Sequence, residues 1–319
     1  MKVLVTGGAG FIGSHLVDAL VAAGHRVTVV DDLSTGSPGN LAAHARATGF
    51  EFIRADFAAE PILSKAVPRA DLVVHLAARV GVADSLKSPE AVHEVNVSRT
   101  LRLLGACAKG KVGRFVFASS ASVYGDAPPP VSEAMAVRPL SPYAASKASC
   151  EAYCRAYQES YGLQTVVLRF MNVYGPRMGG AYGAVMSEFA RSVEAGTPLT
   201  IYGDGRQTRD FVHVGDAARA IMLGATSERA DGETFNVGTG IPTSISDLAE
   251  LFISASGRRG LKVSRVSPRP GEVRHSFADV TKSKRSLGFA ARTGLSEGVG
   301  EFLRWLSGAG RGRAGRRAR

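Results

Sequence analysis

The segment SPYAASK places a tyrosine and a lysine four residues apart, Tyr143 and Lys147. Positions i and i+4 of a helix share one face, so we expect the phenol hydroxyl and the ammonium to lie close together. A tyrosine, whose pKa is ordinarily about 10, is a poor base at neutral pH unless a cation stabilises its phenolate. Lys147 is a candidate for that cation. The pair therefore indicates proton transfer by a lysine-activated tyrosine.

The preceding apolar run, RFVFASSASVYG, predicts a strand that ends in Ser119, Ser120 and Ser122. A serine hydroxyl beside the tyrosine can hydrogen-bond a substrate oxygen as its proton leaves. Taken singly, each residue has a plain structural explanation, because tyrosines anchor helices and serines terminate strands. Their convergence on one strand end and the next helix start favours catalysis.

These residues sit within a regular alternation of strands and helices. Apolar runs predict strands at KVLVTG, RVTVVDD, FEFIRAD, ADLVVHLAA, RFVFASS and TVVLRFMNVYG, and helical spacing predicts helices at FIGSHLVDALVAAGH, PEAVHEVNVSRTLRLLGACAK and from SPYAASK onward. Such alternation implies crossover connections, hence an α/β fold with a doubly wound parallel sheet. The carboxyl ends of its strands share one edge, where ligands bind.

The pattern loosens after about Pro176, into glycine-rich loops, a helix at AVMSEFARSVEAG and a short strand at TFNVG. We therefore expect a Rossmann domain over residues 1–171, with 205–245 returning to it. A smaller α/β substrate-binding domain is expected over 172–204 and 246–308, and a disordered basic tail over 309–319.

The first predicted strand runs into TGGAGFIG, which spaces Gly7, Gly10 and Gly13 by threes before a helix. Glycines there allow a tight turn and a close approach of a pyrophosphate to the backbone at the helix N-terminus. Asp31 ends the next strand, 18 residues after Gly13, where a carboxylate accepts hydrogen bonds from an adenosine ribose and repels a 2′-phosphate. The motif therefore favours NAD over NADP. The plainer interpretation is that Asp31 and Asp32 only cap a solvent loop.

Composition narrows the partners. The net charge of the 319 residues is +11, and nearly half of the excess belongs to the Gly/Ala/Arg tail, so an anionic small molecule explains the remainder better than nucleic acid does. Cys107, Cys150 and Cys154 form no CxxC and are expected to be packed, reduced thiols rather than a metal site. Without a signal peptide or a membrane-length apolar segment, the chain is expected to be cytoplasmic.

The order of TGGAGFIG, HLAA, SSASVYG, SPYAASK, LRFMNVYGPR, IYGDGRQTRDFVHV, FNVGTG and RPGEVRH resembles the extended short-chain dehydrogenase/reductases, in particular their NAD-dependent nucleotide-sugar epimerase/dehydratase group. The likeness extends from Met1 to about Leu306. It implies Ser120, Tyr143 and Lys147 as the catalytic set. It also implies a homodimer formed through helices around 87–109 and 143–161.

The remaining site residues fall into two sets, with no metal ligand expected. The cofactor set is Gly7, Gly10, Phe11, Ile12, Gly13, Asp31, Asp32, Asp56, Leu76, Ala77, Ala78, Asn96, Tyr143 and Lys147. The substrate set that the resemblance implies is Ser120, Asn172, Arg209, Arg269, Glu272 and Ser276.

The resemblance also bears on the reaction. In the family, the tyrosine takes the proton of the sugar 4-hydroxyl while hydride passes from C4 to NAD; dehydratases then use an Asp-Glu pair just after the serine position, and related decarboxylases a glutamate two positions after it. Here those positions are Ala121 and Ser122, which cannot exchange protons near neutrality.

The expected reaction is therefore C4 epimerisation of a UDP-hexose, UDP-glucose/UDP-galactose, with the small Ser276 leaving room for UDP-GlcNAc/UDP-GalNAc. A 4-epimerase of UDP-glucuronate or another nucleotide sugar, a reductase that releases NAD(H), and a non-catalytic NAD-binding scaffold stay open. Arg79, Val80, Gly81 and Ala184 depart from the most familiar galactose epimerases.

Overall fold

The computed structural model describes residues 1–179, 184–268 and 273–308. Its centre is a seven-stranded sheet in the order β11-β6-β5-β4-β1-β2-β3, and every neighbouring pair is parallel. The strands are β1 (Lys2–Thr6), β2 (Arg26–Asp31), β3 (Phe50–Arg54), β4 (Leu72–His75), β5 (Arg114–Ser120), β6 (Gln164–Phe170) and β11 (Thr234–Val237). The predicted doubly wound α/β sheet is confirmed, and the order of its strands reverses beside β1, between β1 and β4.

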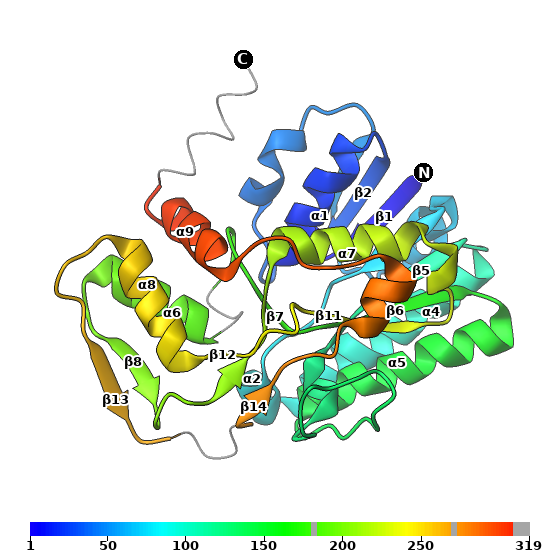
Figure 1. Cartoon of the computed structure of the whole chain (residues 1–319). Helices are drawn as coiled ribbons and strands as arrows, with labels where there is room; N and C mark the ends of the chain where they lie inside the picture. The colour runs from blue at the N-terminus through cyan, green and yellow to red at the C-terminus, as the bar shows by residue number, and fades with distance from the viewer. Residues whose placement is uncertain (180–183, 269–272, 309–319) are drawn as a thin grey trace.

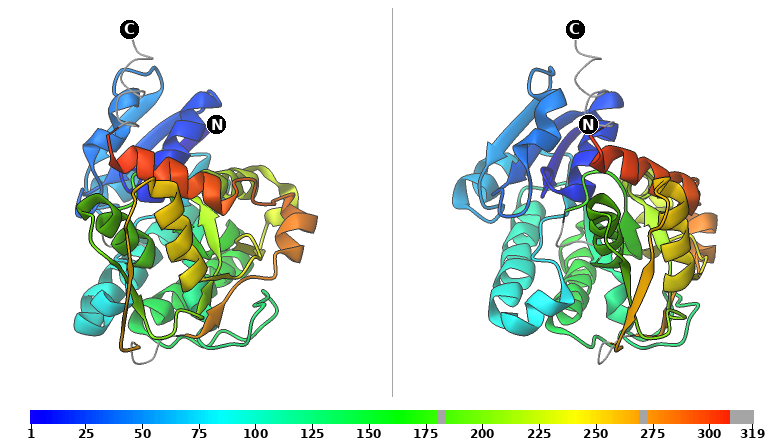
Figure 2. Two further views of the ribbon diagram at one scale, coloured as in Figure 1. Left: turned by 60° about the vertical axis from the view of Figure 1, so that its left-hand side comes forward. Right: turned by 90° about the vertical axis from the view of Figure 1, so that its left-hand side faces the viewer.

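Helices cover both faces of this sheet (Figures 1 and 2). Side chains such as Val3, Val29 and Leu168 pack toward α1 (Phe11–Ala22) and α7 (Val214–Thr226), and side chains such as Leu4 and Phe117 pack on the other face, toward the helices that follow β4 and β5. Those helices are α2 (Val82–Lys87), α3 (Pro89–His93), α4 (Arg99–Lys109) and α5 (Pro142–Tyr161). Burial on both faces explains why the strands read as nearly continuous apolar runs.

Two predicted elements differ in detail. The run TVVLRFMNVYG forms two strands, β6 and β7 (Asn172–Tyr174), because the chain leaves the large sheet after Met171 and pairs with β10 (Phe211–His213) instead. Between α3 and α4 the helix widens into a π-helical turn, η4 (Glu94–Ser98). Such turns occur often at functional sites, and this one carries Asn96.

The second half of the chain forms smaller elements beside the large sheet, at the left of Figure 1. They are the pair β8 (Leu199–Tyr202) and β13 (Val263–Val266), the three-stranded sheet of β9 (Thr208–Arg209), β12 (Thr243–Ser244) and β14 (His275–Ser276), and the helices α6 (Ala184–Ala195), α8 (Ile245–Ser256) and α9 (Leu295–Leu306). Segment 205–245 contributes α7 and β11 to the large-sheet layer and β9, β10 and β12 to the smaller sheets. The division into two domains stays a prediction, and the predicted basic tail lies outside the described residues.

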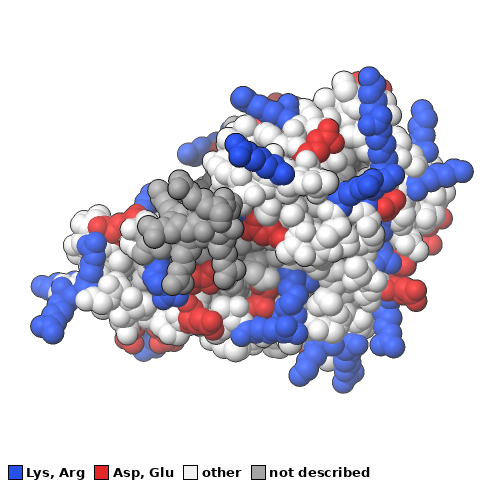
Figure 3. All heavy atoms as spheres, turned by 90° about the horizontal axis from the view of Figure 1, so that it is seen from above, with Lys and Arg blue, Asp and Glu red and all other residues white. Residues whose placement is uncertain are grey.

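The surface carries charged side chains of both signs (Figure 3). Figure 3 shows one face, where Lys and Arg side chains project in separate groups with Asp and Glu among them. Cys107, Cys150 and Cys154 are buried with free thiols, as predicted. None of the helices in the described part combines the length and the apolar composition that a bilayer crossing requires.

Candidate active site

The glycine loop between β1 and α1 leaves no space for side chains. Gly7 has φ +72°, and a Cβ there would lie 2.7 Å from the Ala77 backbone nitrogen. A Cβ on Gly13 would lie 2.2 Å from the Gly7 carbonyl oxygen. The backbone of this loop is therefore bare at the N-terminus of α1, at the sheet edge where β1 and β4 end. These features fit a dinucleotide pyrophosphate.

Asp31 is the last residue of β2, the strand that pairs with β1. Its carboxylate accepts hydrogen bonds from the backbone nitrogens of Ala9, at 2.9 Å, and Leu33, at 2.9 Å. Burial raises the pKa of Asp31, and these two backbone hydrogen bonds act against the rise. Asp32 instead caps its own loop by accepting from Ser34 N at 2.8 Å. Asp31 is tied to the glycine loop itself, so the interpretation of a plain solvent cap fits Asp32 better than Asp31.

A pocket of about 540 Å³ opens above this strand edge. Eight residues of the predicted cofactor set line it: Gly7, Gly10, Asp31, Asp32, Asp56, Leu76, Ala77 and Ala78. Phe11, Ile12, Gly13, Asn96, Tyr143 and Lys147 are not among its lining residues. Phe11 and Gly13 are buried in α1, where they pack rather than face the pocket.

Ser120 and Tyr143 meet at the end of β5. The Ser120 Oγ accepts hydrogen bonds from Ser122 N at 3.2 Å and from Ser122 Oγ at 3.0 Å. The Ser120 side chain also acts on Tyr143, whose pKa it lowers by hydrogen bonding. Tyr143 occupies the first turn of α5, which begins with Ser141 as a cap that accepts from Ala144 N. The cap fixes where α5 begins, and the end of β5 carries Ser120 close to that first turn.

Lys147 lies one turn further along the same helix and is buried. Its ammonium donates to the Ala118 carbonyl oxygen at 2.8 Å and lies 6.0 Å from the centre of the Tyr143 ring. Burial lowers the pKa of Lys147 to about 8. The two polar side chains therefore share a helix face.

In the chain without a bound cofactor, Lys147 is not among the groups that lower the Tyr143 pKa. Burial raises the pKa of Tyr143 to about 12, and the hydrogen bond from Ser120 offsets only part of that rise. The reason lies in the direction of the lysine, whose ammonium is bonded to the Ala118 carbonyl rather than to the phenol oxygen. A further positive charge is needed before the phenol can act as a base near neutrality.

Asn96 joins three parts of the site. Its amide exchanges hydrogen bonds with the backbone of Arg79, accepting from the nitrogen at 2.8 Å and donating to the oxygen at 3.0 Å. It also donates to Ser146 Oγ at 3.0 Å, and Ser146 sits beside Lys147 on α5. The π-helical turn thus ties the loop after β4 to the helix that carries Tyr143. The Asn96 side-chain amide therefore forms its hydrogen bonds with Arg79 and Ser146.

Two buried groups near Lys147 escaped the sequence reasoning. His75 bridges Thr6 Oγ1 at 2.6 Å and Thr100 Oγ1 at 2.8 Å, and burial, together with the charge of Lys147, lowers its pKa to about 3. Glu151 pairs with Arg169 at 2.6 Å and accepts a hydrogen bond from Ser119. His75 could have been recognised from the sequence, because it is a polar residue at the end of the apolar run before LAA. Glu151 could not, because no periodicity of the sequence distinguishes it from other polar residues of its helix.

Arg79 and Arg99 also line the pocket and were not predicted there. Arg99 pairs with Asp56 at 2.5 Å and Glu94 at 3.3 Å, so its charge is balanced. Arg79 pairs with Asp84 at 3.0 Å, and both side chains are about half exposed. Only the departure of Arg79 from the family pattern marked it in the sequence.

Three residues of the predicted substrate set gather around Asp210. Asn172 donates through its side chain to the Asp210 carbonyl at 3.1 Å, and Arg209 and Ser276 are direct partners across β9 and β14. Ser120 pairs with Phe170 in the large sheet, two residues before Asn172. This register places Asn172 next to the end of β5. Arg269 and Glu272 lie outside the described residues.

The parallel doubly wound sheet, the bare glycine loop and the acidic end of β2 define a dinucleotide-binding fold. The model of the NAD dependent epimerase/dehydratase family matches residues 3–238. A UDP-glucose 4-epimerase of Mycolicibacterium smegmatis is 39% identical over 96% of this chain and 98% of its own.

Two solved structures are similar over nearly their whole length. The UDP-glucose 4-epimerase of Thermotoga maritima, with UDP-glucose, has a TM-score of 0.90 and 36% identity, covering 97% of this chain and 99% of its own. The UDP-glucuronic acid 4-epimerase of Bacillus cereus, with UDP-glucuronic acid and NAD, has a TM-score of 0.90 and 33% identity, covering 97% and 100%. The chain belongs to the NAD dependent epimerase/dehydratase family, a family of enzymes whose cofactor is NAD.

Proposed function

We propose that this enzyme epimerises a UDP-hexose at C4 through a 4-keto intermediate, with Ser120, Tyr143 and Lys147 as catalytic residues. The observation that carries the proposal is the meeting of Ser120 and Tyr143 beside Lys147, at the sheet edge where the glycine loop lies. Bound NAD supplies the hydride-transfer chemistry and, when oxidised, the positive charge that the phenol needs.

The side chains divide the proton chemistry between them. Tyr143 Oη takes the proton of the 4-hydroxyl, while Ser120 Oγ hydrogen-bonds the same oxygen as it becomes a carbonyl. Lys147 adds positive charge on the same helix face, held in place by the Ala118 carbonyl. The roles of this triad, and those of Asn172, Arg209 and Ser276 in binding the sugar nucleotide, are part of the proposal.

The groups around Ser120 favour epimerisation over elimination. Ala121 has no proton to exchange, and the Ser122 hydroxyl donates to Ser120. Glu151 is held by Arg169 and Ser119 rather than placed as an acid or base. Among the described residues, none of these three groups is placed to remove water from a 4-keto sugar. Tyr143 and Ser120 are instead placed to return a proton to the C4 oxygen as the hydroxyl forms again, for which bound cofactor would supply the hydride.

The test is to incubate the protein with single UDP-sugars, without added NAD, and to follow C4 epimers by NMR. The panel holds UDP-glucose, UDP-N-acetylglucosamine and, because of the likeness to the Bacillus cereus enzyme, UDP-glucuronic acid. Tyr143→Phe should lower kcat by at least about 100-fold, whereas Tyr161→Phe, which removes an exposed hydroxyl of the same helix, should not. Stoichiometric use of NADH would instead indicate a reductase, and no product from any sugar would favour a binding protein.

A homodimer through α4 and α5 belongs to the same proposal. It is supported by the exposed face of α5, on which Tyr153 is 37% exposed to solvent. Large aromatic side chains on a surface helix are typical of interfaces. Sedimentation that finds only monomer at assay concentrations would contradict it.

A further inference from the structure

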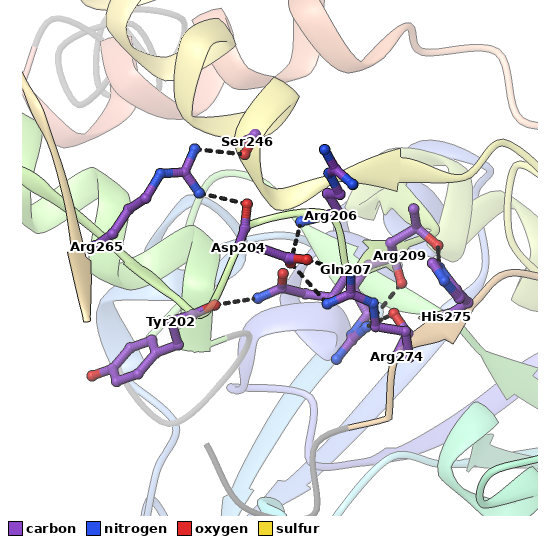
Figure 4. A network of polar contacts seen from close by, with 10 residues as sticks. Tyr202, Asp204, Arg206, Gln207, Arg209, Ser246, Arg265, Arg274 and His275 are labelled. Atoms are coloured by element: carbon purple, nitrogen blue, oxygen red, sulfur yellow. Dashed lines mark hydrogen bonds and ion pairs between the residues drawn. The ribbon is translucent and has the colours of Figure 1, made fainter. Parts of the chain in front are cut away.

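Three segments of the smaller sheets meet at Asp204, in the turn that follows β8 (Figure 4). The Asp204 carboxylate accepts two parallel hydrogen bonds from the Arg274 guanidinium, at 2.8 Å and 2.6 Å. The Asp204 carbonyl oxygen accepts from the Arg265 guanidinium, which extends from β13. We call Asp204, Arg265 and Arg274 the Asp204 clasp.

The clasp is fixed to its own turn as well. Asp204 Oδ1 accepts from the backbone nitrogen of Arg206 at 2.9 Å, and Arg265 reaches Ser246 at the start of α8, at 3.4 Å. The hydrogen bonds of Arg274 and Arg206 hold the pKa of Asp204 far below its ordinary value. The carboxylate is therefore ionised throughout any assay near neutrality, so pH does not open the clasp.

Arg274 connects the clasp to the predicted substrate residues. Its carbonyl oxygen accepts from the Thr208 nitrogen at 3.0 Å, the bond that begins the pairing of β9 with β14. In this register Thr208 pairs with His275, and Arg209 pairs with Ser276. The Arg209 guanidinium also donates to the Arg274 carbonyl, at 3.4 Å. Fixing Arg274 therefore fixes the position at which Arg209 and Ser276 face each other.

This pairing needs help from side chains. Strands β9 and β14 have two residues each, and the paired residues are 67 positions apart in the sequence. Pairs this short are marginal on their own, and bringing distant segments together costs chain entropy. A bidentate arginine–carboxylate contact adds orientation as well as attraction.

We propose that Asp204 is a positioning residue for sugar-nucleotide binding, which it serves by clasping Arg274 so that β14 holds Ser276 against Arg209. This inference rests on the proposed function, because that proposal assigns Arg209 and Ser276 to the substrate. Asp204 acts through Arg274 and does not touch the substrate.

The test uses Asp204→Asn, which keeps the size of the side chain and removes its charge. We expect KM for the accepted UDP-hexose to rise about three- to five-fold, the size of effect that exposed ion pairs show, while kcat stays within about twofold. Calorimetry should show a matching loss of affinity for UDP. The KM of the double variant Asp204→Asn/Arg274→Gln should not exceed the higher of the two single-variant KM values, because both substitutions remove the same contact.

Glu233→Gln is the matched control, since it breaks another exposed ion pair, Glu233 with Lys282 at 2.6 Å, outside the substrate set. Its KM should match the wild type. A lower melting temperature of Asp204→Asn with unchanged KM and UDP affinity would overturn the inference. If the wild type converts no UDP-sugar, the proposed function fails, and an unchanged UDP affinity in Asp204→Asn would then overturn the clasp separately.

Discussion

Replacing Lys147 by methionine should stabilise the NAD-free protein at neutral pH, although it removes a proposed catalytic residue. The ammonium is buried in the folded chain, where burial lowers its pKa from the ordinary 10.5 to about 8. In the unfolded chain the same group is in water. That difference in pKa corresponds to about 3 kcal/mol of lost stability at pH 7. Loss of the hydrogen bond to the Ala118 carbonyl offsets about 1 kcal/mol, which leaves a gain of about 2 kcal/mol for Lys147→Met.

The sign of the pH dependence follows from which state binds more protons. Between pH 8 and pH 10.5 the unfolded chain holds the Lys147 proton more tightly than the folded chain does. The free energy of unfolding of the wild type therefore rises with pH in this window. Lys147→Met lacks this rise, so its advantage should shrink by about 2 kcal/mol between pH 7 and pH 9.5.

Urea titrations of both proteins at pH 7 and pH 9.5 measure this directly, because the difference between them cancels every other titrating group. Lys262→Met, at an exposed lysine, is the control and should show neither the gain nor its pH dependence. The reasoning is refuted if Lys147→Met is less stable than the wild type at pH 7. A difference that does not change with pH would refute it equally.

Three other substitutions test the cofactor site and the fold. Gly13→Ala places a Cβ against the Gly7 carbonyl oxygen, 2.2 Å away, so the purified variant should carry little NAD by chromatography of its denatured extract; wild-type NAD content would contradict the cradle. Asp31→Ala should narrow the preference for NAD over NADP by about tenfold in calorimetric Kd, because the repelling carboxylate is gone; an unchanged ratio would assign that preference elsewhere. Asp210→Ala should lower the free energy of unfolding by about 3 kcal/mol or more, because this buried carboxylate accepts hydrogen bonds from the backbones of Thr239, Gly240 and Ala278; a loss below about 1 kcal/mol in urea would contradict that role.

Most of the large sheet was predictable because each of its strands is a local signal. Runs such as KVLVTG and RFVFASS are long enough to show an apolar pattern, and a buried parallel strand needs nothing else to be recognised. The pairs β9 with β14 and β9 with β12 escaped prediction because strands of two residues have no periodicity. The split of β6 from β7 also escaped, since the apolar run continues through Met171 while its pairing partner changes.

The candidate site divides in the same way. Tyr143 and Lys147 were predicted to share a face because helix geometry fixes i and i+4 neighbours regardless of the rest of the chain. The Tyr143 pKa of the cofactor-free chain could not be predicted in this way, because it depends on burial and on the partner of the Lys147 ammonium, and neither is local. Asp204 with Arg274, 70 residues apart, is beyond any pattern in the sequence.

The sequence by itself determined the parallel sheet, the bare glycine loop before α1 and the tyrosine–lysine spacing, because each rests on backbone geometry within a few residues. Only the tertiary structure decided how far burial shifts the pKa values of Tyr143 and Lys147, and which distant segments meet at Asp204 and Asp210. Desolvation and long-range ion pairs depend on what the fold brings together from far along the chain, and local spacing carries no record of that.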